Sequence, residues 1–192
     1  MKVLNKSSVL GFILGFIAFP IIFSGGAYLY YKIAFGDSDA SGGGGLEPPA
    51  LPGEHVASLD WTVKSLDGTV VNLGEHARDK TLFLNFWATW CGPCVAEMAS
   101  IEKLHSQFGG EMAFVCVSNE QAETLKKFMD DRKFSLPVFV ADAEPPRELN
   151  ESAIPATFII SPQGKILLKH MGGADWAHES VVAFLREQLG RG

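Results

Sequence analysis

The first 36 residues carry a long apolar run and no acidic side chain. Residues 9–23 are almost continuously apolar, and no charged side chain lies within residues 8–31. A helix needs roughly 20 apolar residues to cross a bilayer. We therefore predict that residues 1–36 form an N-terminal transmembrane anchor that contacts the lipid bilayer through residues 8–31. The basic start and the small residues at 24–27 leave a cleaved signal peptide as the alternative.

Beyond the anchor, a Gly- and Pro-rich tether gives way to alternating strands and helices. Residues 37–54 have the composition of a linker, and regular apolar patterns begin at about residue 55. The predicted elements are a hairpin at 61–73 across Asp67-Gly68, strands at 81–87, 112–117 and 137–140, helices at 91–108 and 121–133, a hairpin at 157–169 and a helix at 176–189. This order predicts one α/β domain over residues 55–192, a central mixed sheet flanked by helices with an N-terminal β-hairpin extension.

Composition and charge narrow the classes of function. Hydrophobic residues make up 47% of the chain and charged residues 20%, which is enough apolar material for a packed core. The net charge is −6, and because Lys2, Lys6 and Lys32 are the charged residues of the first 36, the remainder carries −9. An acidic surface matches a polyanion poorly, so we expect no nucleic-acid partner. The basic N-terminus should stay in the cytoplasm, which places the domain on the extracytoplasmic side.

Two of the three cysteines are placed for redox chemistry. Cys91 and Cys94 open a predicted helix directly after a predicted buried strand. One helical turn separates them by a distance that a disulfide can span, and the free N–H groups of the helix start favour a thiolate on Cys91. Gly92 lets the turn form, and Pro93 suits the first turn, where its missing N–H costs nothing. We therefore predict Cys91 as the nucleophile and Cys94 as the resolving thiol.

Other uses of a Cys-x-x-Cys pair remain open from the residues alone. A structural disulfide is one, and half of a zinc site is another, although zinc requires further Cys or His ligands at suitable spacing. Only Cys116 and scattered histidines remain for that purpose. We expect no metal and no other cofactor, and we expect Cys116 to be a buried, inert thiol.

The segment 85–94, Asn-Phe-Trp-Ala-Thr-Trp-Cys-Gly-Pro-Cys, resembles the signature of the thioredoxin superfamily, in particular its membrane-tethered TlpA/ResA-like branch. The likeness covers about residues 55–192 and includes the segment 154–158, Ile-Pro-Ala-Thr-Phe. It implies a thioredoxin-like fold in which Pro155 is a cis-proline that faces the redox pair. Trp87 is expected in the core, and the implied substrate-binding residues are Trp90, Gly92, Pro93 and Ile154.

The resemblance also implies a biological setting. The implied activity is reduction of disulfides in exported proteins, with the cysteines of apocytochrome c as one substrate. An integral-membrane thiol donor would supply the electrons. The protein would be a single-pass protein of the bacterial inner (cytoplasmic) membrane with its catalytic domain in the periplasm. The pair Gly92-Pro93 and the residue Ile154 resemble those of reducing family members more than those of strong oxidants.

Glu97 is the predicted proton-handling group. Thioredoxin carries a buried aspartate where this chain has Asn85, as TlpA/ResA-like proteins do. In those relatives a glutamate three residues after the second cysteine is implicated, and Glu97 occupies that position. A helical projection places Glu97 within the apolar stripe, where desolvation should raise its pKa. A carboxylate that reaches water is the alternative, and Ala99, in place of a helix-kinking proline, leaves the local helix geometry open.

Three further functions remain open at this point. A thiol oxidase or isomerase would use the same cysteine pair to form or rearrange disulfides instead of reducing them. A redox-sensing or chaperone-like binding module would use the pair only as a switch. A peroxidase is suggested by the leading hairpin, although that activity requires a lone peroxidatic cysteine in a different setting.

Overall fold

A computed structural model describes residues 56–141 and 143–190. The predicted anchor at 1–36, with its bilayer contact at 8–31, and the predicted tether at 37–54 lie outside the described residues. Within the part of the chain that is described, no helix is both long enough and apolar enough to cross a membrane.

Seven strands form one mixed sheet in the order β2-β1-β5-β4-β3-β6-β7. β3, β4 and β5 run parallel to one another, whereas the other neighbours pair antiparallel. β3 lies inside the sheet, and five of its six residues are buried, as expected of a strand covered on both faces. The strands are β1 (Thr62–Ser65), β2 (Val70–Asn72), β3 (Thr81–Phe86), β4 (Met112–Ser118), β5 (Val138–Val140), β6 (Ala156–Ile160) and β7 (Ile166–Met171). The predicted α/β class with a mixed sheet is confirmed.

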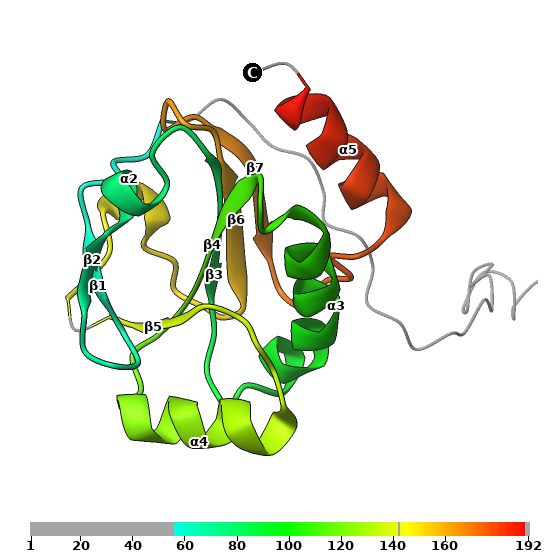
Figure 1. Cartoon of the computed structure of the whole chain (residues 1–192). Coiled ribbons are helices and arrows are strands. Elements are labelled where there is room, and N and C mark those ends of the chain that lie inside the picture. The colour runs from blue at the N-terminus through cyan, green and yellow to red at the C-terminus, as the bar shows by residue number, and fades with distance from the viewer. Residues whose placement is uncertain (1–55, 142, 191–192) are drawn as a thin grey trace, which may run out of the picture. The chain divides into compact units, whose positions relative to one another are not determined.

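Helices cover both faces of this sheet (Figure 1). They are α2 (Leu73–His76), α3 (Gly92–Phe108), α4 (Ala122–Arg132) and α5 (Glu179–Leu189), with a 3-10 turn η1 (Arg147–Leu149). The connections β3–α3–β4 and β4–α4–β5 step in the same direction along the sheet, so right-handed crossovers place α3 and α4 on one face. α5 covers the same face, and α2 lies on the opposite side (Figure 1).

The two faces of the sheet bury separate apolar clusters. The cluster between the sheet and the helices α3, α4 and α5 includes Phe83, Ile101, Leu125 and Leu185. The cluster on the opposite face includes Trp61, Leu73, Leu84 and Phe158. Because β3 contributes to both clusters, the residues that follow it are held from both sides of the sheet.

The last helix and the leading hairpin differ in how closely they follow the predicted bounds. The last helix begins at Glu179 and not at Trp176, so that prediction was wrong by three residues. The reason is the cap: the backbone of His178 is extended, and its Nδ1 accepts the N–H of Ser180. The leading hairpin was predicted correctly, and β1 also pairs with β5, which makes the hairpin part of the central sheet.

Candidate active site

The redox pair lies where β3 ends and α3 begins. Cys91 caps α3, and it forms a disulfide with Cys94 whose Cα atoms are 5.2 Å apart. The N–H of Cys94 donates to Sγ of Cys91 over 3.2 Å. Sγ of Cys91 therefore sits where a helix-capping acceptor sits, and the N–H and the helix dipole both favour negative charge there. In the reduced pair, this environment favours the thiolate of Cys91.

The sulfur atoms are largely covered, whereas the residues around them are open to solvent. Cys94 is fully buried, and Cys91 exposes 6% of its surface. Trp90 exposes 72%, and Gly92 and Pro93 are also exposed. A second thiol or disulfide can therefore approach Cys91 and not Cys94.

The segment before β6 faces the disulfide. The Ile154–Pro155 peptide bond is cis, as the resemblance implies. The carbonyl oxygen of Ile154 lies 3.8 Å from Sγ of Cys91. Pro155 is buried, and its carbonyl accepts the N–H of Gly172 over 2.8 Å. The backbone of Ile154 is thus the part of this segment that lies beside the exposed sulfur.

Glu97 lies one turn after Cys94 and exposes none of its surface. Its Oε1 accepts the Nδ2–H of Asn85 over 2.8 Å. Its Oε2 accepts the backbone N–H of Ala174 over 3.1 Å and the indole N–H of Trp176 over 3.0 Å. Three donors, from β3 and from the loop before α5, hold this carboxyl group inside the core.

Burial and hydrogen bonding act in opposite directions on the pKa of Glu97. Desolvation raises the pKa, and with all contributions included it stands at about 7 instead of 4.5. This effect outweighs the hydrogen bonds from Trp176, Asn85 and Ala174, which favour the carboxylate and lower the pKa. A carboxyl group with a pKa near neutrality can both accept and release a proton at ordinary pH.

Asn85 links Glu97 to the neighbouring strands. Its Nδ2 group also donates to Oγ1 of Thr157 on β6, again over 2.8 Å. Cys116 pairs with Asn85 in the register of β3 and β4 and is buried, as predicted. Burial, and to a lesser extent the charge of Glu97, raises the pKa of the Cys116 thiol far above its usual value. A thiol that stays protonated is a poor nucleophile.

Two residues that hold the site were missed by the sequence analysis. Glu120, in the loop after β4, accepts the backbone N–H and the hydroxyl of Thr89, each over 2.7 Å, and so fixes the loop that carries Trp90. The apolar pattern assigns Trp176 to a helix, whereas it lies in a loop and donates to Glu97. No local signal marks either role, because these contacts join residues 31 and 79 positions apart.

No group of three or more His, Cys, Asp or Glu residues in the described part of the chain is arranged to hold a metal ion. A Cys-x-x-Cys disulfide at a helix start, next to a cis-proline on this sheet, defines a thioredoxin-like thiol–disulfide oxidoreductase.

The chain belongs to the AhpC/TSA family, which matches residues 53–169. The thioredoxin-like protein YneN of Bacillus subtilis is 33% identical over 123 residues, which cover 62% of this chain and 72% of the relative. The thiol-disulfide oxidoreductase ResA of Halalkalibacterium halodurans is 30% identical over 154 residues, which cover 76% of this chain and 78% of the relative. This chain is thus a thiol–disulfide oxidoreductase of the ResA type.

Solved structures share the fold. A thiol:disulfide interchange protein of Chlorobium tepidum, from the thioredoxin family, matches with a TM-score of 0.59 and 22% identity over 72% of this chain and 99% of the other. StoA of Bacillus subtilis matches with a TM-score of 0.52 and 18% identity over 71% and 99%. At these identities the likeness shows that the architecture is thioredoxin-like.

Proposed function

We propose that this oxidoreductase is a disulfide reductase that acts on exported proteins outside the cytoplasm. The observation that carries the proposal is the setting of Cys91, whose Sγ accepts an N–H at the start of α3 and lies beside the exposed Trp90. The proposal includes a membrane anchor at 1–36, a tether at 37–54 and a catalytic domain at 55–192.

The cycle starts from the reduced pair. The Cys91 thiolate attacks one sulfur of the substrate disulfide, so that a mixed disulfide forms and the other substrate sulfur leaves as a thiolate, which takes up a proton. Cys94 then loses its proton and attacks Sγ of Cys91, which releases the first substrate sulfur as a thiol. Two electrons pass to the substrate, and the pair ends as the Cys91–Cys94 disulfide of this structure. A membrane thiol donor returns the pair to the dithiol.

Glu97 serves as the proton acceptor for Cys94 in this cycle. Residues three apart lie on the same face of a helix, so Glu97 is on the face that carries Cys94. Its burial and its pKa of about 7 suit a group that takes the Cys94 proton and later returns it. Because Cys94 is buried as well, solvent cannot easily perform that transfer.

The substrate contacts the surface around Cys91. An extended segment of the substrate pairs with the backbone of Ile154, whose carbonyl lies beside the reactive sulfur. Trp90, Gly92 and Pro93 form the exposed surface on the other side of Cys91. Pro155 is buried and positions Ile154.

The direction of electron flow is tested by the reduction potential of the Cys91–Cys94 couple. The pair Gly92-Pro93 and the residue Ile154 support a reductase. We expect a value near that of thioredoxin, about −270 mV, from equilibration with glutathione or dithiothreitol buffers of known potential. A value near that of the oxidase DsbA, about −120 mV, would instead favour the thiol oxidase.

Substrate trapping identifies the proteins on which the chain acts. In a Cys94→Ala variant of the full chain, the mixed disulfide on Cys91 cannot be resolved, so exported substrates should accumulate as covalent adducts. Apocytochrome c is one substrate class that the family resemblance suggests. The Cys91→Ala/Cys94→Ala double variant is the control and should form none. Absence of adducts with the single variant would favour a binding module.

A further inference from the structure

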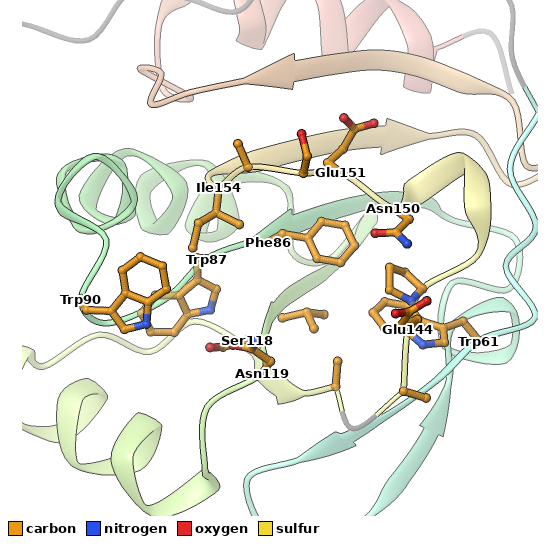
Figure 2. Close-up of a pocket in the computed structure, with 16 residues that line it drawn as sticks. Trp61, Phe86, Trp87, Trp90, Ser118, Asn119, Glu144, Asn150, Glu151 and Ile154 are labelled. Atoms are coloured by element: carbon orange, nitrogen blue, oxygen red, sulfur yellow. The ribbon is translucent and has the colours of Figure 1, made fainter.

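A cleft of about 840 Å³ begins at Trp90 and Ile154, the neighbours of Cys91, and extends across the ends of β3 and β4. Figure 2 shows the side chains that line it. Trp90 and Ile154, which flank Cys91, line one part of the cleft. Trp61 and Glu144 line the opposite part (Figure 2). The cleft is therefore continuous with the surface that a substrate of Cys91 must contact, but most of its lining lies outside that surface.

The walls of the cleft are aromatic and its charged groups are acidic. Four rings line it, and two of them, Trp61 and Phe86, stack with their centroids 5.9 Å apart. Among its described lining residues, two carry carboxylates and none carries a positive charge. Glu144 is exposed, and Glu151 is half-buried and forms an ion pair with Lys169. Aromatic faces and carboxylates both attract a cation, and aromatic walls also suit an alkyl chain.

Two buried donors in the cleft have no acceptor within the described protein. The indole nitrogens of Trp61 and Trp87 make no hydrogen bond there, although these residues expose only 5% and 2% of their surface. Both side chains line the cleft (Figure 2). Because both nitrogens are themselves buried, the two indoles meet a ligand in the cleft through the carbon atoms of their rings.

We propose that this cleft binds the stretch of substrate polypeptide next to the attacked cysteine and selects for an arginine or lysine side chain in it. The alkyl part of that side chain packs against the aromatic rings, and its cation faces Glu144. This inference rests on the proposed function, since it names the class of disulfide substrate that the reductase prefers.

The distance from the sulfur limits where the basic residue lies in the substrate. The cleft begins at Ile154, whose carbonyl is 3.8 Å from Sγ of Cys91. An extended chain advances about 3.3 Å per residue, so about three residues span roughly 10 Å. A basic residue two positions from the attacked cysteine can therefore reach the cleft, whereas one at the far end of a long peptide cannot.

The test measures kcat/KM for reduction of four synthetic peptides by the reduced full-length chain. Each peptide contains one disulfide, and three of them differ only at the positions two residues from each cysteine, which hold Arg, Gln or Glu. The fourth peptide has the same composition as the Arg peptide, but its Arg residues lie at the end of the peptide that is distant from the disulfide. We expect kcat/KM for the peptide with Arg two residues from each cysteine to be about tenfold higher than for the Gln peptide. It should also be about tenfold higher than for the peptide whose Arg residues are distant from the disulfide.

Variants locate the preference within the cleft. Glu144→Gln should lower the Arg-to-Gln ratio about fivefold. Trp61→Phe replaces the indole by a smaller ring that attracts a cation less strongly, and it should raise KM for the Arg peptide about threefold. Glu111→Gln is the matched control, because it makes the same change in charge beyond the opposite end of β4, and it should preserve the ratio.

The outcomes separate this inference from the proposed function. Equal kcat/KM values for the Arg, Gln and Glu peptides would overturn the cleft proposal while the reductase proposal stands. Equal values for the two Arg peptides would show that net charge alone attracts them, and would overturn it too. If no peptide is reduced at all, the reductase proposal itself fails.

Discussion

Glu97 shows how a single side chain acquires its chemistry from its surroundings. An exposed glutamate is ionised at neutral pH, whereas this one is fully buried and has a pKa of about 7. Its three donors, from Asn85, Ala174 and Trp176, keep the ionised form accessible in spite of burial. The residue can therefore exist in either protonation state in the folded protein near pH 7. A fully solvated carboxyl group would stay ionised at that pH, and a buried one without donors would stay protonated.

The first prediction concerns the titration of the cysteine pair. Glu97→Gln removes the titratable group but keeps the size of the side chain. If Glu97 accepts the proton of Cys94, the variant should show an altered pH dependence of thiol reactivity and should resolve mixed disulfides more slowly near pH 7. Alkylation rates of the reduced protein measured from pH 5 to 10 test this. An unchanged pH profile would remove Glu97 from the mechanism.

The second prediction concerns stability and pH. Because the pKa of Glu97 is about 7 in the folded protein and 4.5 as the reference value, the folded state holds an extra proton between these pH values. The free energy of unfolding should therefore fall as pH rises from about 4.5 to about 7, by roughly 3 kcal/mol from this group. Urea unfolding of the oxidised protein at several pH values measures it. Glu97→Gln should lose this slope, and equal slopes in both proteins would contradict the assignment.

The third prediction concerns the hydrogen bond from Trp176. This donor favours the carboxylate, so Trp176→Phe should raise the pKa of Glu97 above about 7. A carbon-13 NMR titration of the Glu97 side chain reports the change directly. Trp90→Phe is the matched control, because Trp90 is exposed and makes no contact with Glu97 among those described. A shift of equal size in both variants would contradict a specific effect of the hydrogen bond.

At the scale of the elements, the site depends on how three segments meet at one end of the sheet. α3 begins after β3 and presents Cys91, the segment before β6 presents Ile154, and the loop after β7 supplies Ala174 and Trp176. The β6–β7 hairpin therefore connects the part of the site that faces Cys91 to the part that holds Glu97. Its turn requires Gly164, which has a φ of +83°.

The fourth prediction concerns this turn. A Cβ at Gly164 would lie 2.9 Å from the carbonyl oxygen of Ala57, and the positive φ disfavours any side chain. Gly164→Ala should therefore lower the free energy of unfolding by about 1–3 kcal/mol, as measured by urea unfolding. Gly110→Ala is the control, because nothing lies within 4 Å of the added Cβ and its φ is not positive. Equal stability of the two variants would contradict the argument.

At the scale of the whole molecule, location decides what the cysteine pair can do. An uncharged, mostly apolar N-terminal segment precedes a domain of the ResA type, and the charged residues of the first 36 are basic. We therefore propose that the redox pair lies outside the cytoplasm, where protein disulfides persist. A tethered reductase also stays near a membrane donor of electrons.

The fifth prediction tests this location in bacterial cells that produce the full chain. In a Cys94→Ala variant, treatment of the cells with dithiothreitol releases Cys91 from its mixed disulfides. After the reductant is removed, a maleimide that cannot cross membranes should label Cys91 in intact cells. Labelling only after the cells are lysed would place the domain in the cytoplasm. The Cys91→Ala/Cys94→Ala variant should stay unlabelled in both cases, because Cys116 is buried.

Much of the architecture follows from local patterns in the chain. The strand at 81–87 and the helix at 91–108 were predicted to within a residue, because continuous apolar runs and helical spacing are properties of neighbouring residues. The same holds for Cys91 and Cys94, whose reactivity arises from one turn of helix. The start of α5 was misplaced because Trp176 continues an apolar pattern, whereas His178 caps the helix and leaves Trp176 in the loop before it.

The sequence by itself determined the fold class, which follows from the order of the elements, and the redox pair and the burial of Glu97, which follow from spacing along α3. Only the tertiary structure decided which donors surround Glu97, how Glu120 holds the loop of Trp90, and how Trp61 and Trp87 come to line one cleft. These contacts join segments that are far apart in the chain. No local pattern encodes them, because they form only when distant segments of the chain pack together on the sheet.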